Sequence, residues 1–112
     1  MANYQTVTPM SLGQTAVGTA VSTIYISPKQ TLTAIQNIIV ANTTGSSATY
    51  SIFLVPSAGT AGTANAIFYN TTLAANSTFS LTCFQILSAG WTIQVQASAT
   101  GLTITASGNQ YV

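Results

Sequence analysis

The sequence predicts an all-β domain, a single β-sandwich or jelly-roll-like barrel of seven or eight short antiparallel strands. Its 112 residues are dominated by strand formers, with 20 Thr and 10 Ile alongside Val, Tyr and Phe. Clusters of Gly, Pro, Asn and Ser recur about every 8 to 12 residues, which is the turn spacing of sandwiches and barrels. Signals for helices are weak, because the chain has no acidic residue to favour a first helical turn.

The N-terminal third begins with a segment of weak pattern. Residues 1–12 alternate poorly between polar and apolar, which leaves open an N-terminal arm that docks elsewhere. Residues 23–27 alternate and are followed by Pro28, which stops a strand ladder. Residues 31–41 carry apolar residues at helical spacing but end in β-branched residues, so we expect a strand.

The middle of the chain predicts a hairpin followed by a loop. Residues 42–47 (NTTGSS) form a turn cluster between two apolar runs, which indicates a hairpin connection. Residues 48–55 are the next strand, and Pro56 closes it. Residues 57–65 contain only small or polar side chains, so we expect an exposed and mobile loop.

Four further extended segments follow in the C-terminal half. Residues 66–69 predict a strand that could continue to Leu73, and residues 77–82 alternate with two apolar side chains on one face. Residues 85–87 continue the extended chain to a turn at 88–90. The clearest alternation is at 92–97, and the last expected strand covers 102–107.

The apolar positions of these strands define one expected core, and we expect residues 1–112 to form a single domain. Their alternate positions hold Thr, Ser and Gln, which we expect to face outward. The predicted inward set is Ile24, Ile26, Ile35, Ile38, Ile52, Leu54, Phe79, Leu81, Ile93, Val95, Leu102 and Ile104.

The near absence of charge excludes most chemistry. The chain has one Lys, Lys29, and no Arg, Asp, Glu or His. General acid–base catalysis, carboxylate metal sites and the Ser-His-Asp triad all need residues that are missing. One lysine cannot form the basic surface that binds nucleic acid. We therefore expect a protein that is not an enzyme, has no catalytic, cofactor-binding or metal site, and binds no nucleic acid.

Cys83 is the single cysteine, so it cannot form a disulfide within the chain. No histidine is present to activate its thiol, and we interpret it as a small core residue at a strand end. The longest apolar runs are far shorter than the roughly 20 residues of a membrane-spanning helix. The N-terminus has no basic and apolar signal pattern, so we expect synthesis in the cytoplasm of the host cell and no membrane partner.

An uncharged polar surface favours association. Soluble proteins stay apart through net charge, and edge strands are usually protected by charged side chains. This chain has a net charge of +1 and lacks that protection, so we expect a homo-oligomer or another close partner. Three Asn-x-Thr patterns begin at Asn42, Asn70 and Asn76, and we interpret these asparagines as turn residues.

Four aromatic residues are the candidate interaction surface. We expect Tyr4, Tyr69, Trp91 and Tyr111 to be exposed. Exposed aromatic rings can stack on sugars, but they also dominate protein cores and subunit contacts. Both interpretations are open from the sequence.

Several turn motifs resemble those of small β-sandwich virion proteins of tailed bacteriophages, such as head decoration (cement) proteins. These motifs are Asn42-Thr43-Thr44-Gly45, Leu54-Val55-Pro56-Ser57, Ala75-Asn76-Ser77-Thr78 and Leu87-Ser88-Ala89-Gly90. The family usually has acidic residues at the positions of Trp91 and Gln110, so this chain departs from it there.

The resemblance implies a capsid decoration protein on the outer surface of the virion. Such a protein would bind the major capsid protein as a symmetric oligomer, expected to be a trimer, and would stabilise the shell. Two alternatives are a tail-fibre or baseplate module that binds a receptor or glycan, and a self-assembling coat or filament subunit.

Overall fold

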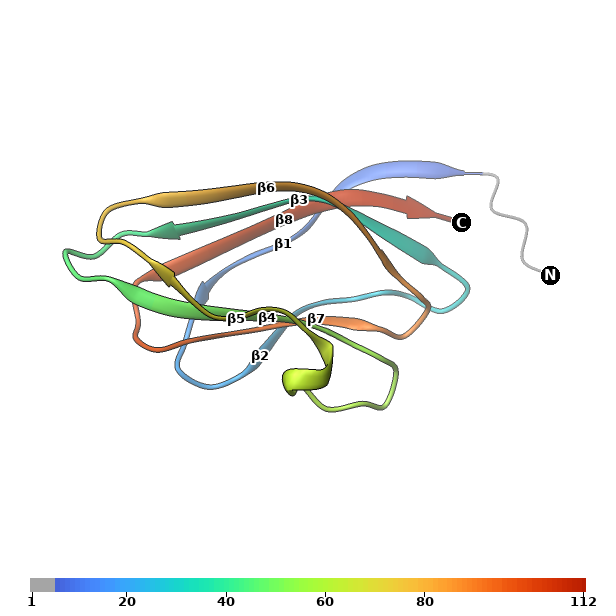
Figure 1. The fold of residues 1–112 in the computed structure, drawn as a ribbon. Helices are drawn as coiled ribbons and strands as arrows, with labels where there is room; N and C mark the ends of the chain where they lie inside the picture. The colour runs from blue at the N-terminus through green and yellow to red at the C-terminus, as the bar shows by residue number, and fades with distance from the viewer. Residues whose placement is uncertain (1–5) are drawn as a thin grey trace.

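The computed structural model describes residues 6–112, which form two antiparallel sheets of four strands packed face to face (Figure 1). The predicted all-β sandwich is confirmed. In chain order the strands are β1 (Val7–Val17), β2 (Ser22–Ile26), β3 (Leu32–Asn42), β4 (Ala48–Val55), β5 (Ala66–Leu73), β6 (Thr78–Leu87), β7 (Thr92–Ala97) and β8 (Leu102–Tyr111).

The two sheets are interleaved in sequence. The first sheet has the order β1-β8-β3-β6 and the second the order β2-β7-β4-β5. Most loops therefore carry the chain from one layer to the other. The strands β3 and β8 lie at the centre of the first sheet, and β4 and β7 lie at the centre of the second.

The core lies between the sheets and is made by alternate residues of the central strands. Val40 pairs with Ile104 and Ile38 with Ala106, so that these apolar side chains lie on the same inner face. Residues of the predicted inward set that are buried in this core are Ile35, Ile38, Ile52, Leu54, Ile93, Val95, Leu102 and Ile104.

The prediction was wrong for Ile26, which is 60% exposed. Ile26 ends β2, an edge strand, and the register of β2 against β7 shifts between Thr23 and Tyr25. This β-bulge interrupts the alternation on which the prediction relied. Ile24 and Phe79 pack partly buried against the core, whereas Leu81 is only half-buried.

The two ends of the chain contribute more strand than the pattern predicts. Residues 7–12, expected as part of an arm, are the first half of β1 and pair with the end of β8. Strand β8 extends to Tyr111, four residues beyond the predicted end. The segments predicted at 77–82 and 85–87 form the single strand β6, in which Cys83 lies inside the strand rather than at its end.

The outer face of the second sheet is also partly covered. Phe53 and Val55 point away from the main core, since Ile52 and Leu54 point into it, yet both are buried. The loop after Pro56 folds back, with the Gly59 amide donating to the Pro56 carbonyl oxygen at 2.9 Å beside Val55. The same loop contains a short 3-10 helix, η1 (Thr63–Asn65), where the sequence predicted no regular structure.

A hydroxyl network links the two sheets near the start of β3. The hydroxyls of Tyr25 and Ser27 each lie 2.9 Å from Thr33 Oγ1, and the Gln110 side-chain amide donates to Tyr25 Oη at 2.7 Å. Ser27 and Thr33 are buried. Each hydroxyl has a partner, so the network fixes the layers without leaving an unsatisfied polar group.

Candidate interaction surface

The two sides of the sandwich differ in how they close. On one side the edge strands β1 and β2 meet at Gly13, where a β-carbon would lie 2.8 Å from the carbonyl oxygen of Ile24. The glycine therefore permits close approach of the two backbones.

On the opposite side the edge strands are β5 and β6, which are joined by the turn at residues 74–77 and pack together through side chains. Phe68 of β5 and Phe79 of β6 pack edge to face with ring centroids 5.6 Å apart. Tyr50 of β4 lies 5.8 Å from Phe68 and 6.5 Å from Phe79. We call this side, with its aromatic cluster, the open side.

All four edge strands carry β-bulges, which are a common protection of sheet edges. The extra residue is Leu12 in β1 and Ile24 in β2. In β5 there is an extra residue on each side of Phe68, which pairs with Ile52 of β4. In β6 the extra residue lies between Thr82 and Gln85, which pair with Asn37 and Ile35 of β3. In a chain without acidic residues, bulges take the place of charged side chains at the edges.

Bulges also redirect side chains, and both bulges on the open side expose an aromatic ring. Phe84, within the β6 bulge, is 61% exposed, and Tyr69, within the β5 bulge, is 56% exposed. The neighbouring Asn70 has a φ of 47°, a left-handed conformation that asparagine tolerates.

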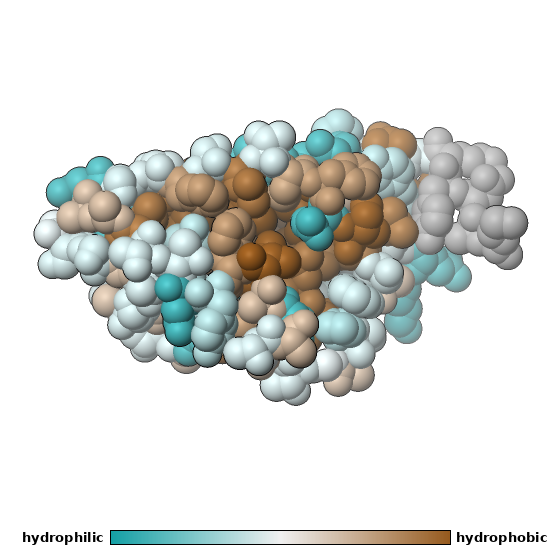
Figure 2. Space-filling view, viewed as in Figure 1, coloured by the Kyte–Doolittle hydropathy of each residue, from teal (hydrophilic) through white to brown (hydrophobic). Residues whose placement is uncertain are grey.

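The open side presents apolar surface. Figure 2 shows hydrophobic residues gathered across the middle of the face in view, below β6 and towards β4 and β5. Ile86 of β6 is 37% exposed, close to Phe84 in the strand. Strand β6 contains neither a charged residue nor a proline along its ten residues. Its outer edge is therefore an uncharged strand edge of the kind that accepts another strand.

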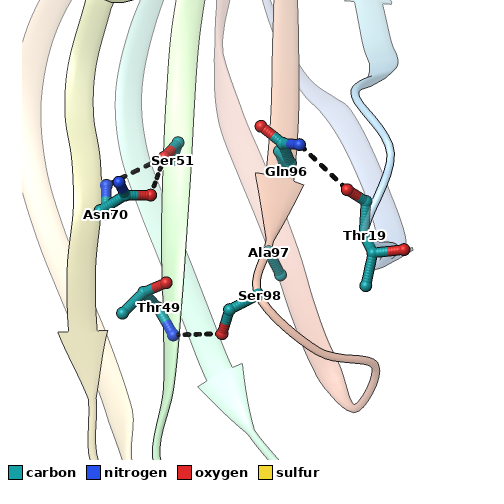
Figure 3. A pocket seen from close by; sticks show the side chains of 7 residues that line it. All are labelled: Thr19, Thr49, Ser51, Asn70, Gln96, Ala97 and Ser98. Carbon is teal, nitrogen blue, oxygen red and sulfur yellow. Dashed lines mark hydrogen bonds between the residues drawn. The ribbon is translucent and has the colours of Figure 1, made fainter.

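A polar hollow of about 300 Å³ lies across β5, β4 and β7 of the second sheet (Figure 3). It is lined by hydroxyl and amide side chains that bond to neighbouring backbone. The backbone amide of Asn70 donates to Ser51 Oγ at 2.9 Å, and the backbone amide of Thr49 donates to Ser98 Oγ at 2.9 Å. Gln96 Nε2 donates to the Thr19 carbonyl oxygen at 3.0 Å. Because its groups already bind one another, the hollow is a poorer ligand site than the open side.

The structure places the predicted aromatic residues on separate elements. Tyr4 lies outside the described residues. Tyr69 is on β5, Trp91 is in the turn before β7, and Tyr111 ends β8 in the other sheet. Trp91 and Tyr111 are half-buried, and Trp91 packs against the core. The aromatic pairs found among residues 6–112 join Tyr50, Phe68 and Phe79 instead, and none includes a predicted residue.

Phe84 is the exposed residue that the sequence reasoning missed. A simple alternation through 77–87 gives no reason to separate Phe84 from the other apolar residues of the strand. Its exposure depends on the bulge, where two residues of β6 face one residue of β3. The position of the bulge therefore depends on the partner strand and not on the sequence of β6 alone.

The three asparagines of the Asn-x-Thr patterns have structural roles at chain reversals or irregularities. Asn42 is 3% exposed, and its Nδ2 donates to the carbonyl oxygens of Ser46, Leu73 and Ala74. Asn76 has a φ of 53° in the turn before β6, and Asn70 is at the β5 bulge. The turn interpretation is confirmed for Asn76, whereas Asn70 lies within a strand.

Few groups of the chain can titrate. Burial raises the pKa of the Cys83 thiol and that of the Tyr50 phenol above their ordinary values. Cys83 Sγ lies 3.9 Å from the carbonyl oxygen of Ile35. A raised pKa keeps the thiol protonated, which makes it a poor nucleophile.

Residues 6–112 contain no group of three or more Cys, His, Asp or Glu side chains that could hold a metal ion. No helix within the same range has the length and apolar character needed to cross a membrane.

Comparisons with known proteins identify a fold. No protein-family profile matches the chain, and no curated protein sequence matches it. A chain in the structure of the infectious bursal disease virus Gx strain superposes with a TM-score of 0.54 and 12% identity over 94% of this chain. A chain in the structure of the T13 particle of that virus gives 0.53 and 10% over 97%. This chain spans 31% of the length of each of those chains.

These matches define the class of fold. The superpositions cover 94% and 97% of this chain, so both sheets take part. At 10–12% identity the likeness is one of architecture and not of side chains. The chain is thus a β-sandwich similar to part of a chain found in virus-particle structures.

Proposed function

We propose that this chain is a non-enzymatic structural protein of a virus particle. The observation that carries the proposal is the superposition of nearly its whole length on chains from virus-particle structures. The composition supports it independently, since a chain with one Lys and no Arg, Asp, Glu or His lacks the usual catalytic groups.

Within that class we propose a capsid decoration protein that binds the outer shell as a symmetric oligomer, with the major capsid protein as its partner. The turn motifs that resemble phage decoration proteins support this role. Contacts made without ionised side chains are insensitive to salt and vary little with pH, which suits a protein that stabilises a shell in changing surroundings. The trimeric state is part of this proposal.

The second candidate is a self-assembling coat subunit. It is favoured by the same superposition, because one of the matched chains belongs to the structure of a complete viral particle. A coat subunit would form particles or filaments alone, whereas a decoration protein would add only to a shell that already exists.

Light scattering after size exclusion, followed by mixing with shells that lack this protein, tests the proposal. A decoration protein elutes as a defined oligomer and co-sediments with the shells at a fixed ratio. A coat subunit forms closed or filamentous particles alone in electron micrographs. A protein that stays monomeric, forms no particle and never sediments with shells would overturn the proposed function.

A further inference from the structure

The four sheet edges are not equally able to accept another strand. Strand β1 contains Pro9, which cannot donate to a ladder, and it lies against β2 at Gly13. Strand β2 has five residues, and the register of β5 shifts twice. Strand β6 has ten residues, one bulge and no proline. It is the longest edge strand with no proline and only one bulge, and one of its sides has no partner strand within residues 6–112.

The side chains along this edge favour burial. Phe84 and Ile86 are 61% and 37% exposed, and the aromatic cluster of Phe68 and Phe79 lies on the same side of the molecule. Large exposed aromatic and aliphatic residues are the usual centres of binding energy in protein interfaces. A strand added to β6 would pair with its backbone, and the side chains of that strand would pack beside Phe84 and Ile86 as cross-strand neighbours.

The charge of the surface selects the occupant. A partner with Lys, Arg, Asp or Glu at its contact would have to desolvate those groups against an edge that offers no opposite charge. A second copy has no acidic residue and only Lys29, which lies in the turn before β3, beside the Leu87 end of β6, so an antiparallel two-fold pairing keeps the two lysines at opposite ends. Two copies of β6 therefore meet without either like-charge repulsion or an unpaired charge.

The available area is sufficient for a modest interface. At about 3.4 Å per residue, ten residues of β6 extend over about 34 Å. The smallest extent of the molecule is 17 Å, and taking this value as the width of the open side gives roughly 580 Å² per copy. Specific interfaces bury about 800 Å² per partner, and weak or transient ones bury less. Strand hydrogen bonds would add to the apolar contact.

We propose that the outer edge of β6 pairs with β6 of a second copy, antiparallel and about a two-fold axis. The pairing would join the first sheets of two copies into one eight-stranded sheet and would bury Phe84 at its centre. This inference deepens the proposed function and rests on it, since a structural protein of a particle must contact its neighbours. Such a two-fold contact can form a dimer or join neighbouring oligomers.

The variants Phe84→Lys and Ile26→Lys form a matched pair for the test. Both residues are exposed to about the same extent, 61% and 60%, but Ile26 is on β2 on the closed side. Sedimentation of the full chain over a range of concentrations measures self-association. We expect Phe84→Lys to weaken it about tenfold or more, because a lysine would be buried without a partner, and Ile26→Lys to leave it unchanged.

Hydrogen exchange provides a readout that does not depend on a variant. The amides of β6 should exchange more slowly in concentrated wild-type protein than in dilute protein, whereas those of β2 and β5 should not change. Protection at another edge, equal effects of the two variants, or a wild type that is monomeric at all concentrations would overturn the pairing.

Shell binding separates this inference from the proposed function. A protein that binds shells but does not pair through β6 would disprove the pairing and leave the structural role intact. Loss of shell binding in Phe84→Lys, with no self-association in the wild type, would mean that β6 contacts the shell protein instead and would also overturn the pairing. Self-association through β6 with no binding to shells and no particle formation would contradict the proposed function alone.

Discussion

Phe68 of β5 and Phe79 of β6 meet edge to face, with ring centroids 5.6 Å apart, and connect the two sheets where no backbone pairing does. The opposite side is closed by the backbones of β1 and β2. The open side therefore depends on aromatic packing for its stability, and the same side presents the exposed aromatic residues Tyr69 and Phe84. Stability and assembly can be tested separately on β6, because Phe79 packs in the aromatic cluster whereas Phe84 lies at the proposed contact between copies.

Phe79→Ala should destabilise the fold and Phe84→Ala should not. Phe79 packs against the core and two aromatic rings, so its truncation is expected to lower the free energy of unfolding by about 2–3 kcal/mol. Phe84 is 61% exposed, and its truncation is expected to change stability by less than about 0.5 kcal/mol. Urea denaturation measures both values, and similar costs for the two variants would contradict the assignment of the cluster.

Gly108→Ala should be strongly destabilising. A β-carbon at Gly108 would overlap the carbonyl oxygen of Ala34 on the paired strand β3, where the backbone cannot easily yield. We expect a loss of about 2 kcal/mol or more. Gly45→Ala is the control, since a β-carbon there meets nothing within 4 Å, and it should stay within about 0.5 kcal/mol of the wild type. A stable Gly108→Ala protein would argue against the register of β3 and β8.

Asn42→Asp should make stability depend on pH. Asn42 Oδ1 already accepts from the backbone amide and the hydroxyl of Thr44, whereas Nδ2 faces three carbonyl oxygens. A second carboxylate oxygen in place of Nδ2 would gain no donor and would be repelled by these carbonyls. The new carboxyl should therefore have a pKa raised by the fold. Stability is then retained below the ordinary carboxyl pKa of about 4 and is lost as pH rises above it.

The measurement is the unfolding midpoint of Asn42→Asp at about pH 3.5 and pH 7. The control is Asn76→Asp, in an exposed turn with a φ of 53°, which aspartate also tolerates. We expect its midpoint to differ little between the two pH values. If Asn42→Asp were equally stable at both, the amide network around this residue would be wrong.

Wild-type stability should be flat in mildly acidic and neutral solution and fall in alkali. The chain has no Asp, Glu or His side chain to titrate between about pH 5 and 8. Burial raises the pKa of Cys83 above 9.0 and that of Tyr50 above 10.0, so both groups are neutral in the folded state. The contribution of these two neutral groups to the free energy of unfolding is fully present below about pH 9. It is lost as pH rises further, because the thiol and the phenol ionise at lower pH in the unfolded chain than in the folded one.

Denaturation of the wild type and of Cys83→Ser across this range measures the effect. The wild type should lose stability from about pH 9 upward, and the variant should begin to lose it at a higher pH because only Tyr50 remains. A marked loss of wild-type stability between pH 7 and 5 would show that some other group controls the fold.

The sequence alone was sufficient to predict the bounds of strands that alternate without interruption. The predicted bounds at 48–55 and 92–97 coincide with β4 and β7, because neither strand contains an extra residue of its own and both lie at the centre of a sheet. The pattern failed at β1, where Pro9 and Gly13 interrupt it. The pairing that makes these residues a strand comes from β8, which is about 90 residues away in the sequence.

The interaction surface was less predictable than the fold. Tyr69 was selected as an exposed aromatic residue and is exposed, but Phe84 was not selected. Both exposures arise at bulges, which depend on how many residues of one strand face those of its neighbour. Ile26 was assigned to the core for the same reason. The outer-face burial of Phe53 and Val55 depends on a loop whose small residues gave no sign that it folds back.

The most direct test of the structural role is the protein content of virus particles that carry this sequence in their genome, purified on a density gradient. Quantitative peptide mass spectrometry gives the number of copies of this chain relative to the shell protein. A structural protein should be present in many copies at a constant ratio through repeated purification in high salt. Its absence from purified particles, with all of the protein in the soluble fraction of infected cells, would contradict the account.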